Sequence, residues 1–470
     1  MTKKTKIVAT IGPATESKKM MLEMALAGMN VVRLNFSHGT HEEHKNRINL
    51  AHYISKKIGE PIAVLADLCG PKIRIGDFYH ESIILKNGQS FIFTTQKCVG
   101  DERRVSVNYK NLPKEIKKGS KILLNDGKNE FKVEKISGSE IFARVIVGGE
   151  IKGRRGMNLP GAYLKISSLT KKDKEDIKFA IKNKVDFMAI SFVRKPADVL
   201  ELKKILSKAK ADIKVIAKIE TQEAIENLDK IIEASDAIMV ARGDLAVEVP
   251  AEHVPILQKI IIGRCNDLGK PVITATQMLD SMVRNPVPTR AEVNDVANAI
   301  LDGTDAVMLS EETTLGSYPL KAVEVMDRIS RHTEENFKHE EILKHKHLLP
   351  KTVNDSISYA IVTTAHNINA KAIVALTEYG KTARMISRYK PKQPILALTP
   401  NKYTYNRLAL SFGCYGRMIK PFKDVSEVID VAKELAVKNN VAKKGDKIVI
   451  GAGIPFGKAG TTNLLIVQTI

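Results

Sequence analysis

The sequence lacks tryptophan and has only four cysteines among its 470 residues: Cys69, Cys98, Cys265 and Cys414. They are scattered without a Cys-x-x-Cys pair, which excludes a disulfide framework and a thiolate zinc site and favours a reducing compartment. No apolar run reaches the roughly 18 residues that a membrane span needs, and the segment from Met1 to Lys6 carries no signal-peptide core. We therefore expect a cytoplasmic protein that is neither exported nor bound to a membrane.

Acidic residues are fewer than basic ones, with 53 Asp and Glu against 74 Lys and Arg. The formal charge of +21 could serve nucleic-acid binding, because clustered basic residues bind phosphate backbones. However, the lysines recur along helix-like stretches such as 171–184 and 203–210, often beside Glu or Asp, which is typical of a solvated helix face. We therefore expect no nucleic-acid partner.

The length of the chain indicates more than one domain, because single hydrophobic cores stop growing at about 250 to 300 residues. Short β-branched apolar runs alternate with longer amphipathic stretches, which is typical of repeated βα units around a parallel sheet. These runs cover residues 6–11, 30–35, 62–67, 187–192, 214–220, 237–241, 271–276 and 306–310. They predict an α/β protein with a closed (β/α)8 TIM barrel, formed by residues 1–70 and 166–337.

The interval between the third and fourth runs predicts an inserted all-β domain, residues 71–165. Its short alternating segments are separated by turn pairs that include Asn87-Gly88 and Asp126-Gly127. Because such an insertion emerges at the C-terminal end of barrel strand three, it can act as a lid over the site. A polar, histidine-rich linker that matches no recognised metal site follows the barrel. Renewed βα alternation then predicts a C-terminal α/β domain, residues 338–470.

Polar residues gather at the C-terminal ends of the barrel runs, where barrel enzymes build their active sites. In VVRLNFSHG, Arg33, Asn35 and Ser37 are spaced by two, so an extended chain turns them toward one side. A forked cation beside two neutral oxygen groups suits a phosphate with a cation. Lys218 and Glu220 share a face in the same way. A solvated strand end and a barrel-lining salt bridge explain these two patterns about equally well.

Further oxygen ligands follow the next run. In VARGDL, Asp244 comes after Gly243, a residue at which a ligand can approach the backbone closely. Glu220 and Asp244 form a pair of hard oxygen ligands, and two carboxylates with waters and substrate oxygens are the usual way to hold Mg²⁺. The residues that converge on the mouth are Arg33, Arg74, Lys218, Glu220 and Asp244. Their combination predicts phosphoryl transfer, which depends on positioning and on neutralising the charge of the moving group.

The C-terminal domain contains ALTEYGKTARMI, in which Gly380-Lys381-Thr382 resembles a Walker A loop. The first glycine of that motif would fall at Ala375, so the ATP-binding P-loop is not met. A loop that opens a helix can still bind a phosphate through Thr377, Lys381 and Thr382, because helix N-termini favour anions. An ordinary βα turn that contains a lysine is an equally good interpretation.

Several long motifs together resemble one family, the pyruvate kinases: KIVATIGPA, MNVVRLNFSHG, KIET, VARGDLAVEVP, ITATQMLDSM and MLSEETTLGSYP. The likeness runs from Lys6 to Ile470 and includes the order of the three domains. It implies transfer of the phosphoryl group of phosphoenolpyruvate to ADP, which gives ATP and pyruvate in the final step of glycolysis. It also implies Mg²⁺ or Mn²⁺ as the cofactor, and a homotetramer.

The resemblance implies a role for each site residue. Lys218 would stabilise charge on the transferring phosphoryl group, and Arg33 would contact the phosphate of phosphoenolpyruvate. Glu220 with Asp244 would hold the divalent metal, and Thr276 would help deliver the proton that converts enolpyruvate to pyruvate. The implied contacts of the substrate carboxylate are Gly243, Asp244 and Thr276, and those of the nucleotide are Asn35, His38, Arg74 and Arg155.

One position departs from the family pattern. Many members carry an acid where Lys72 follows DLCGP, and they need a bound potassium ion. A fixed ammonium could replace that ion and would repel a second cation. We therefore predict activity without potassium. The positions that match the family's potassium site are Asn35, Ser37, Asp67 and the carbonyl of Leu68.

The resemblance also implies an effector site in the C-terminal domain, where a phosphorylated metabolite would bind. Its positions are Thr377, Gly380, Lys381, Thr382, Gly460 and Thr461. Tyr379 replaces the small residue that is usual there. This bulk disfavours fructose bisphosphate and leaves AMP or a sugar phosphate as the expected effector.

Two other functions are weighed against this one. A metal-dependent phosphoenolpyruvate or pyruvate aldolase or lyase could use Lys218 with a metal on Glu220 and Asp244. It needs no nucleotide lid, so dependence on ADP would exclude it. A basic nucleic-acid-binding protein on a decayed enzyme scaffold is the non-enzymatic alternative, and salt-sensitive DNA retention without turnover would support it.

Overall fold

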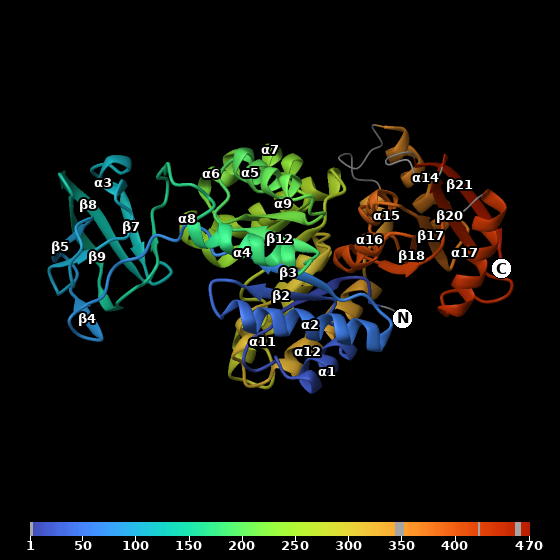
Figure 1. Ribbon diagram of the computed structural model, residues 1–470, viewed down its shortest axis with the longest axis horizontal. Coiled ribbons are helices and arrows are strands. Elements are labelled where there is room, and N and C mark those ends of the chain that lie inside the picture. Colours follow the sequence, from blue (N-terminus) through green and yellow to red (C-terminus); the bar gives the residue numbers. More distant parts are fainter. Residues whose placement is uncertain (1–2, 344–351, 422–423, 456–461) are drawn as a thin grey trace.

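The computed structural model describes residues 3–343, 352–421, 424–455 and 462–470, and three parts follow one another along its longest axis (Figure 1). The inserted β-sheets lie at one end, the barrel lies in the middle and the C-terminal sheet lies at the other end. Within the described ranges, no helix is long and apolar enough to cross a membrane.

Parallel strands close into a barrel in the order β1-β16-β15-β14-β13-β12-β3-β2. Their bounds are β1 Lys6–Thr10, β2 Val31–Asn35, β3 Ala63–Asp67, β12 Phe187–Ile190, β13 Lys214–Ile219, β14 Ala237–Ala241, β15 Val272–Ala275 and β16 Ala306–Leu309. The predicted fold class is confirmed. Most positions of these strands are apolar because alternate residues enter two cores. In β3, Leu65 fills the barrel interior and Val64 packs against the outer helices.

Helices cover the outside of the barrel. They are α1 Lys18–Leu26, α2 His41–Ile58, α4 Lys171–Lys182, α5 Pro196–Lys208, α6 Gln222–Glu226, α7 Leu228–Ala234, α8 Arg242–Glu248, η1 Ala251–His253, α9 Val254–Asp267, η2 Asp280–Val283, α10 Arg290–Leu301, α11 Glu311–Thr314 and α12 Pro319–Glu335. In α2, α4 and α10 a threonine caps the first turn and an acid three residues later bonds back to it, as Thr40 and Glu43 do. These caps satisfy backbone N–H groups that the first turn leaves unpaired.

The inserted region contains two sheets, with strand orders β10-β4 and β11-β7-β8-β9-β5-β6. Its elements are β4 Ser82–Leu85, β5 Ser90–Thr94, β6 Arg104–Ser106, α3 Leu112–Glu115, β7 Lys121–Leu124, β8 Asn129–Ser137, β9 Glu140–Val147, β10 Gly149–Lys152 and β11 Met157–Asn158. Asp126-Gly127 lies between the antiparallel strands β7 and β8 and makes a hairpin. Asn87-Gly88 does not, because β4 pairs with β10 whereas β5 pairs with β9 and β6.

The C-terminal part is a mixed sheet in the order β19-β18-β17-β20-β21, in which only β21 runs antiparallel to its neighbour. Its elements are α13 His339–Leu343, α14 Val353–Asn367, β17 Ala372–Leu376, α15 Lys381–Ser387, β18 Ile395–Thr399, α16 Lys402–Arg407, η4 Leu408–Leu410, β19 Cys414–Met418, α17 Val425–Lys438, β20 Lys447–Gly453 and β21 Thr462–Thr469. Most of the histidine-rich linker lies outside the described residues.

Candidate active site

Charged and polar side chains from five strands lie at the C-terminal mouth of the barrel. Arg33 lies in β2, Asp67 ends β3, Lys218 lies in β13 with Glu220 just beyond it, Asp244 follows β14 in α8, and Thr276 follows β15. Parallel strands present their carboxyl ends at one rim, so residues far apart in sequence come together there.

Arg33 is held by the end of the next strand. Its Nε and Nη2 lie 2.8 and 2.7 Å from Asp67 Oδ2, and its Nη1 donates to Thr10 Oγ1 at 2.8 Å. Both Arg33 and Asp67 are buried. The guanidinium is therefore fixed in one orientation before any substrate binds.

Lys218 lies between two buried carboxylates. Its Nζ is 2.9 Å from Glu220 Oε1 and 3.5 Å from Asp67 Oδ1, and it donates to Ser191 Oγ at 2.8 Å. The salt bridge that the sequence offered as an alternative is present, but it is one part of a larger cluster. The ammonium is therefore placed at the rim of the barrel with its direction set by three partners.

Burial and charge act against each other in this cluster. Burial lowers the pKa of Lys218, but the carboxylates of Asp67 and Glu220 outweigh it and hold that pKa above its ordinary value. Burial raises the pKa of Asp67, but the cations Lys218 and Arg33 outweigh it and the pKa is lowered. Burial, supported by the nearby charge of Asp244, raises the pKa of Glu220. A divalent cation bound beside Glu220 would oppose this effect, because its positive charge favours the charged carboxylate.

Two buried carboxylate oxygens at the mouth, Asp67 Oδ1 and Glu220 Oε1, accept no hydrogen bond of good geometry, although each forms an ion pair with Lys218 Nζ, at 3.5 and 2.9 Å. The other oxygen of Glu220 is used, because Oε2 accepts from the backbone N–H of Phe192 at 2.6 Å. The described residues contain no cluster of three or more His, Cys, Asp or Glu that could cage a metal. An open pair such as Glu220 and Asp244 fits Mg²⁺, which keeps waters and substrate oxygens in its remaining positions.

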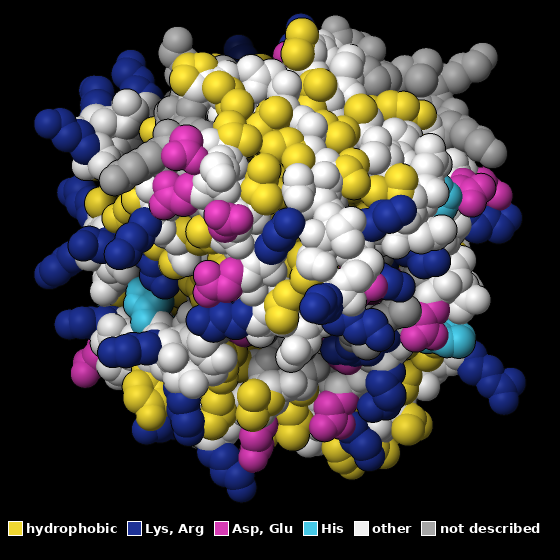
Figure 2. Space-filling view, turned by 90° about the vertical axis from the view of Figure 1, so that its right-hand side faces the viewer, with side chains coloured by type: hydrophobic (Ala, Val, Ile, Leu, Met, Phe, Trp, Pro, Cys, Tyr) yellow, Lys and Arg dark blue, Asp and Glu magenta, His cyan; other side chains and the backbone are white. Residues whose placement is uncertain are grey.

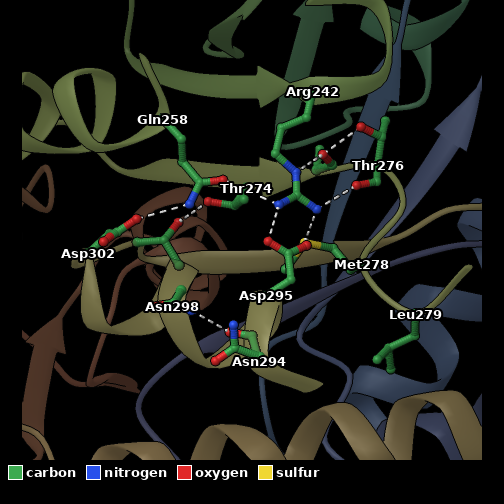
Figure 3. Close-up of polar contacts among 12 residues, drawn as sticks. Arg242, Gln258, Thr274, Thr276, Met278, Leu279, Asn294, Asp295, Asn298 and Asp302 are labelled. Carbon is green, nitrogen blue, oxygen red and sulfur yellow. Dashed lines mark hydrogen bonds and ion pairs between the residues drawn. The ribbon is translucent and has the colours of Figure 1, made fainter. Parts of the chain in front are cut away.

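Thr276 lies against α8. Its Oγ1 accepts a hydrogen bond from the backbone N–H of Gly243 at 2.7 Å. In this structure it is therefore the Thr276 hydroxyl that approaches the backbone of the glycine closely. Arg242, the residue before Gly243, points toward the backbone of Thr276 and toward Asp295 (Figure 3). Arg242 is therefore part of the support of the site.

The expected nucleotide residues lie on two segments. Arg74 and Arg155 lie on the paired strands that connect the inserted sheets with the barrel: Arg74 pairs with Gly156, and the carbonyl of Arg155 accepts from the N–H of Ile75. His38 is exposed in the turn after β2, and Asn35 at the end of β2 is half-buried. Arg74 donates through Nη1 to the carbonyl of Arg154 at 3.2 Å, and Arg155 is exposed.

The expected monovalent-cation residues differ in how accessible they are. The carbonyl of Leu68 already accepts from Ser191 Oγ at 2.7 Å. The extended chain does not reach Ser37, because β2 ends at Asn35 and Ser37 lies exposed in the following turn. There its backbone N–H donates to Asn35 Oδ1 at 3.1 Å. The spacing argument for Ser37 was wrong because it assumed an extended chain.

Lys72 contacts the other side of the site. Its Nζ lies 3.8 Å from Asp244 Oδ1, and its stem packs over Gly156, where a side-chain carbon would come within 2.6 Å of Lys72 Cε. The ammonium thus pairs with one of the two carboxylates that fit a divalent metal. This pairing links residues from the lid connection to the barrel mouth.

The loop before α15 is compact. Thr377 and Thr382 are buried, and Thr382 Oγ1 lies 2.9 Å from Thr462 Oγ1 at the start of β21. Gly380 has φ of +79°, which favours glycine, and Lys381 is exposed. The structure thus brings residues of this loop to Thr462, whereas Gly460 and Thr461 lie outside the described residues.

Two residues that the sequence analysis did not select complete the mouth: Ser191, which holds Lys218, and Thr10, which holds Arg33. Both are hydroxyl residues at the ends of predicted apolar runs. Their position at a strand end could have indicated a role in the site, but hydroxyl residues are common at strand ends for other reasons. Only the contact with a charged side chain makes these two distinctive.

This fold and this mouth define a class of protein: a barrel enzyme with a fixed guanidinium, an oriented ammonium and a pair of carboxylates for a phosphorylated substrate and a metal ion. Residues 2–323 match the family model described as "Pyruvate kinase, barrel domain", and residues 355–468 match "Pyruvate kinase, alpha/beta domain". The chain belongs to the pyruvate kinase family and is a phosphotransferase.

Individual relatives agree with the family models. The pyruvate kinase of Geobacillus stearothermophilus is 46% identical over 100% of this chain and 81% of its own length. That of Clostridium perfringens (strain 13 / Type A) is 46% identical over 99% of this chain and 100% of its own length. The crystal structure of a pyruvate kinase from Cryptosporidium parvum superimposes with a TM-score of 0.94 at 37% identity, covering 99% of this chain and 96% of that one. None of these findings favours the aldolase or lyase alternative.

Proposed function

We propose that the chain transfers the phosphoryl group of phosphoenolpyruvate to ADP, giving ATP and pyruvate as the final step of glycolysis, and that it does so without potassium. The observation that carries the proposal is Lys218, whose side chain is only 12% exposed and whose ammonium lies between the buried carboxylates of Asp67 and Glu220. Phosphoryl transfer needs fixed positive charge and a cation around the moving group. The free thiols of all four cysteines agree with a cytoplasmic location.

The substrate would lie across the mouth. Arg33 would contact the phosphate, and Lys218 would neutralise the charge that spreads over the phosphoryl oxygens in the transition state. The carboxylate end would lie toward Gly243, Asp244 and Thr276. Because the N–H of Gly243 is bonded to Thr276 Oγ1 in this structure, the two residues would receive the substrate together.

Glu220 and Asp244 would hold Mg²⁺ or Mn²⁺. When bound, the metal would supply positive charge that orients the phosphoryl oxygens and stabilises them during transfer. Lys72 pairs with Asp244 in this structure and would give up that contact to the metal.

ADP would bind between Asn35 and His38 on the barrel and Arg74 and Arg155 on the lid connection. A cleft lies between the inserted region and the barrel, lined by Lys72, Arg194 and Glu248 among others, but none of the four proposed nucleotide contacts lines it. Across it, Asn158 of β11 donates to Glu248 of α8 at 3.1 Å. Closure of the inserted region would exclude water and limit hydrolysis of the phosphoryl donor.

Potassium independence rests on the charge already present at the mouth. The expected potassium positions are Asn35, Ser37, Asp67 and the carbonyl of Leu68. Asp67 is already neutralised by Arg33 and Lys218, and the Leu68 carbonyl has a partner in Ser191. The ammonium of Lys72 adds a third cation nearby, so a further monovalent ion would meet repulsion.

The test is pyruvate formation from phosphoenolpyruvate, ADP and Mg²⁺ in a tetramethylammonium buffer, followed by addition of potassium. We expect full activity before potassium is added. Activity that appears only with potassium would keep the enzyme assignment and reject the role of Lys72. No turnover under either condition would reject the proposed reaction.

We propose also that a phosphorylated metabolite, AMP or a sugar phosphate, binds at Thr377, Gly380, Lys381 and Thr382 together with Gly460 and Thr461. The contact of Thr382 with Thr462 supports the approach of these segments. A titration with AMP or a sugar phosphate that leaves the phosphoenolpyruvate saturation curve unchanged would reject this site.

A homotetramer is proposed from the family. The edge strand β21 supports self-association, because it has a neighbour on one side only and Val467 on it is 41% exposed. Figure 2 shows hydrophobic side chains gathered on this end of the molecule. The molar mass in solution, measured by light scattering, tests the assembly.

A further inference from the structure

The backbone at Thr276 is held in an unfavourable conformation. Thr276 has φ of +68° and the next residue, Gln277, has φ of +53°. A β-branched residue rarely adopts this left-handed region, and such residues persist only where their surroundings hold them. Because Thr276 follows β15 at the barrel mouth, the cause of this conformation bears on the site itself.

Arg242 is what holds this turn. Its Nη2 donates to the carbonyl of Thr276 at 2.8 Å, and its Nε donates to the carbonyl of Ala275 at 3.2 Å (Figure 3). The next residue, Gly243, donates its N–H to Thr276 Oγ1 at 2.7 Å. Two consecutive residues of α8 thus fix the carbonyl and the hydroxyl of one threonine.

The carbonyl of Ala275 also receives the Thr276 hydroxyl, at 2.6 Å. The guanidinium of Arg242 and the hydroxyl of Thr276 therefore share one acceptor. A positively charged donor on the same carbonyl weakens its hold on the hydroxyl proton and fixes where that proton lies.

Asp295 of α10 orients the guanidinium. Its Oδ1 lies 2.7 Å from Arg242 Nη1, and the side chains of Arg242 and Asp295 are 11% and 37% exposed. Within the described part of the chain, this is the only ion pair of Arg242. Gln258 Oε1 accepts a weaker bond from the same Nη1 at 3.3 Å. Loss of the carboxylate would leave a nearly buried cation without its counter-charge and free to turn.

We infer that Arg242 and Asp295 are positioning residues that aim the Thr276 hydroxyl for the protonation step. This inference rests on the proposed function. After the P–O bond to the enol oxygen breaks, the enolate carries the electron pair. A C–H bond then forms at its methylene carbon with the proton of Thr276 Oγ1, and water restores that proton. Arg242 touches neither the substrate nor the proton, and acts through the backbone of Thr276.

The two half-reactions separate this role from a general structural one. Protonation is measured as exchange of the methyl protons of pyruvate in D2O, by proton NMR, with Mg²⁺ and inorganic phosphate present. Phosphoryl transfer is measured as ATP formed in the first turnover from phosphoenolpyruvate and ADP. We expect Asp295→Asn and Arg242→Lys to slow exchange by about tenfold to a hundredfold, as small misplacements of a reacting group do. ATP formation should stay within about threefold of the parent.

Asp212→Asn is the matched control. Asp212 pairs with Arg407 at 2.9 Å, and the side chains of Arg407 and Asp212 are 8% and 44% exposed, close to the values for Arg242 and Asp295. We expect this variant to keep both rates, and Asp295→Glu to recover part of the lost exchange. Equal loss of both rates in Asp295→Asn, or no loss of exchange, would overturn the inference. Equal loss of exchange in Asp212→Asn would also overturn it.

Failure of the inference differs from failure of the proposed function. If the parent chain makes no pyruvate from phosphoenolpyruvate and ADP, the proposed function is rejected. If the parent turns over and exchange in Asp295→Asn equals that of the parent, only the positioning role is rejected. Should Arg242→Lys fail to fold, Asp295→Asn alone decides, since its side chain keeps nearly the same volume.

Discussion

The two ends of the barrel both bury charged groups, but they treat them differently. At the closed end, against the C-terminal sheet, Asp305 Oδ1 is 2.9 Å from Lys390 Nζ and also accepts from the N–H of Phe412, while Oδ2 accepts from the N–H of Val272. At the mouth, Asp67 and Glu220 each keep an oxygen without a hydrogen bond. A carboxylate whose two oxygens both accept hydrogen bonds stabilises a contact, whereas one with an oxygen held only by an ion pair can turn that oxygen to a metal cation.

The same contrast appears in the chemical state of buried aspartates. At the closed end, burial raises the pKa of Asp186 to about 6, although backbone and side-chain donors oppose it. At the mouth, burial also acts on Asp67, but Lys218 and Arg33 hold its pKa below its ordinary value. At the mouth, Lys218 and Arg33 therefore keep Asp67 charged. The same two cations can bind and neutralise a phosphate group.

Replacing Lys218 by methionine is expected to have the largest effect. It should lower kcat by about a thousandfold or more, because it removes fixed charge from the phosphoryl group, and a single such donor is commonly worth a factor of 10² to 10³. Steady-state pyruvate formation measures the loss, and circular dichroism checks folding. A loss below about tenfold would contradict the contrast between the two ends.

The control for this experiment is Lys390→Met at the closed end. Lys390 is buried more deeply than Lys218, with side chains 1% and 12% exposed, and it pairs with one carboxylate, Asp305, at the same distance of 2.9 Å that separates Lys218 from Glu220. Its loss should lower stability by about 3 to 5 kcal/mol, because Asp305 stays buried without its cation. The folded molecules should keep the parent kcat, so the two lysines would separate activity from stability.

Ionisation of Asp186 is expected to have a smaller effect than the loss of Lys218 or Lys390, and it should change stability rather than activity. Its pKa is raised from 3.8 to about 6 on folding, so the folded state binds a proton more tightly than the unfolded chain does. The free energy of unfolding should therefore fall as the pH rises between about 4 and 6, by up to about 3 kcal/mol from this group. Asp186→Asn should remove that slope in urea unfolding experiments. A slope that persists unchanged would mean that other groups cause it.

The strands and turns could be predicted well from the sequence, because the signals for them lie in neighbouring residues. The run Ala237–Ala241 is a strand in both the prediction and the structure, since a strand buried on both faces must be apolar throughout. The lid hairpin at Asp126-Gly127 was visible because a turn needs special residues. Both signals lie within a few adjacent positions.

The direction of individual side chains was not visible in the same way. Arg242 directly precedes the predicted site residues Gly243 and Asp244, yet it turns to Asp295, which lies 53 positions further along the chain. Lys72 was assigned to a monovalent site, and the structure pairs it with Asp244. Ser37 was placed on an extended strand that ends at Asn35. Each of these depends on which other element packs nearby, and spacing along one segment carries no information about that.

The smallest expected effect concerns the hydroxyl that holds Lys218. Ser191→Ala removes the bond between Lys218 Nζ and Ser191 Oγ but leaves both carboxylates, so kcat should fall only about tenfold, the worth of one hydrogen bond to a charged group. Ser387→Ala is the counterpart at the closed end, where the hydroxyl donates to the carbonyl of Phe412 at 2.7 Å. It should leave kcat unchanged in the same assay. If both variants lowered kcat equally, the loss would not be specific to the mouth, and if Ser191→Ala left kcat unchanged, the activity would not depend on the bond that orients Lys218.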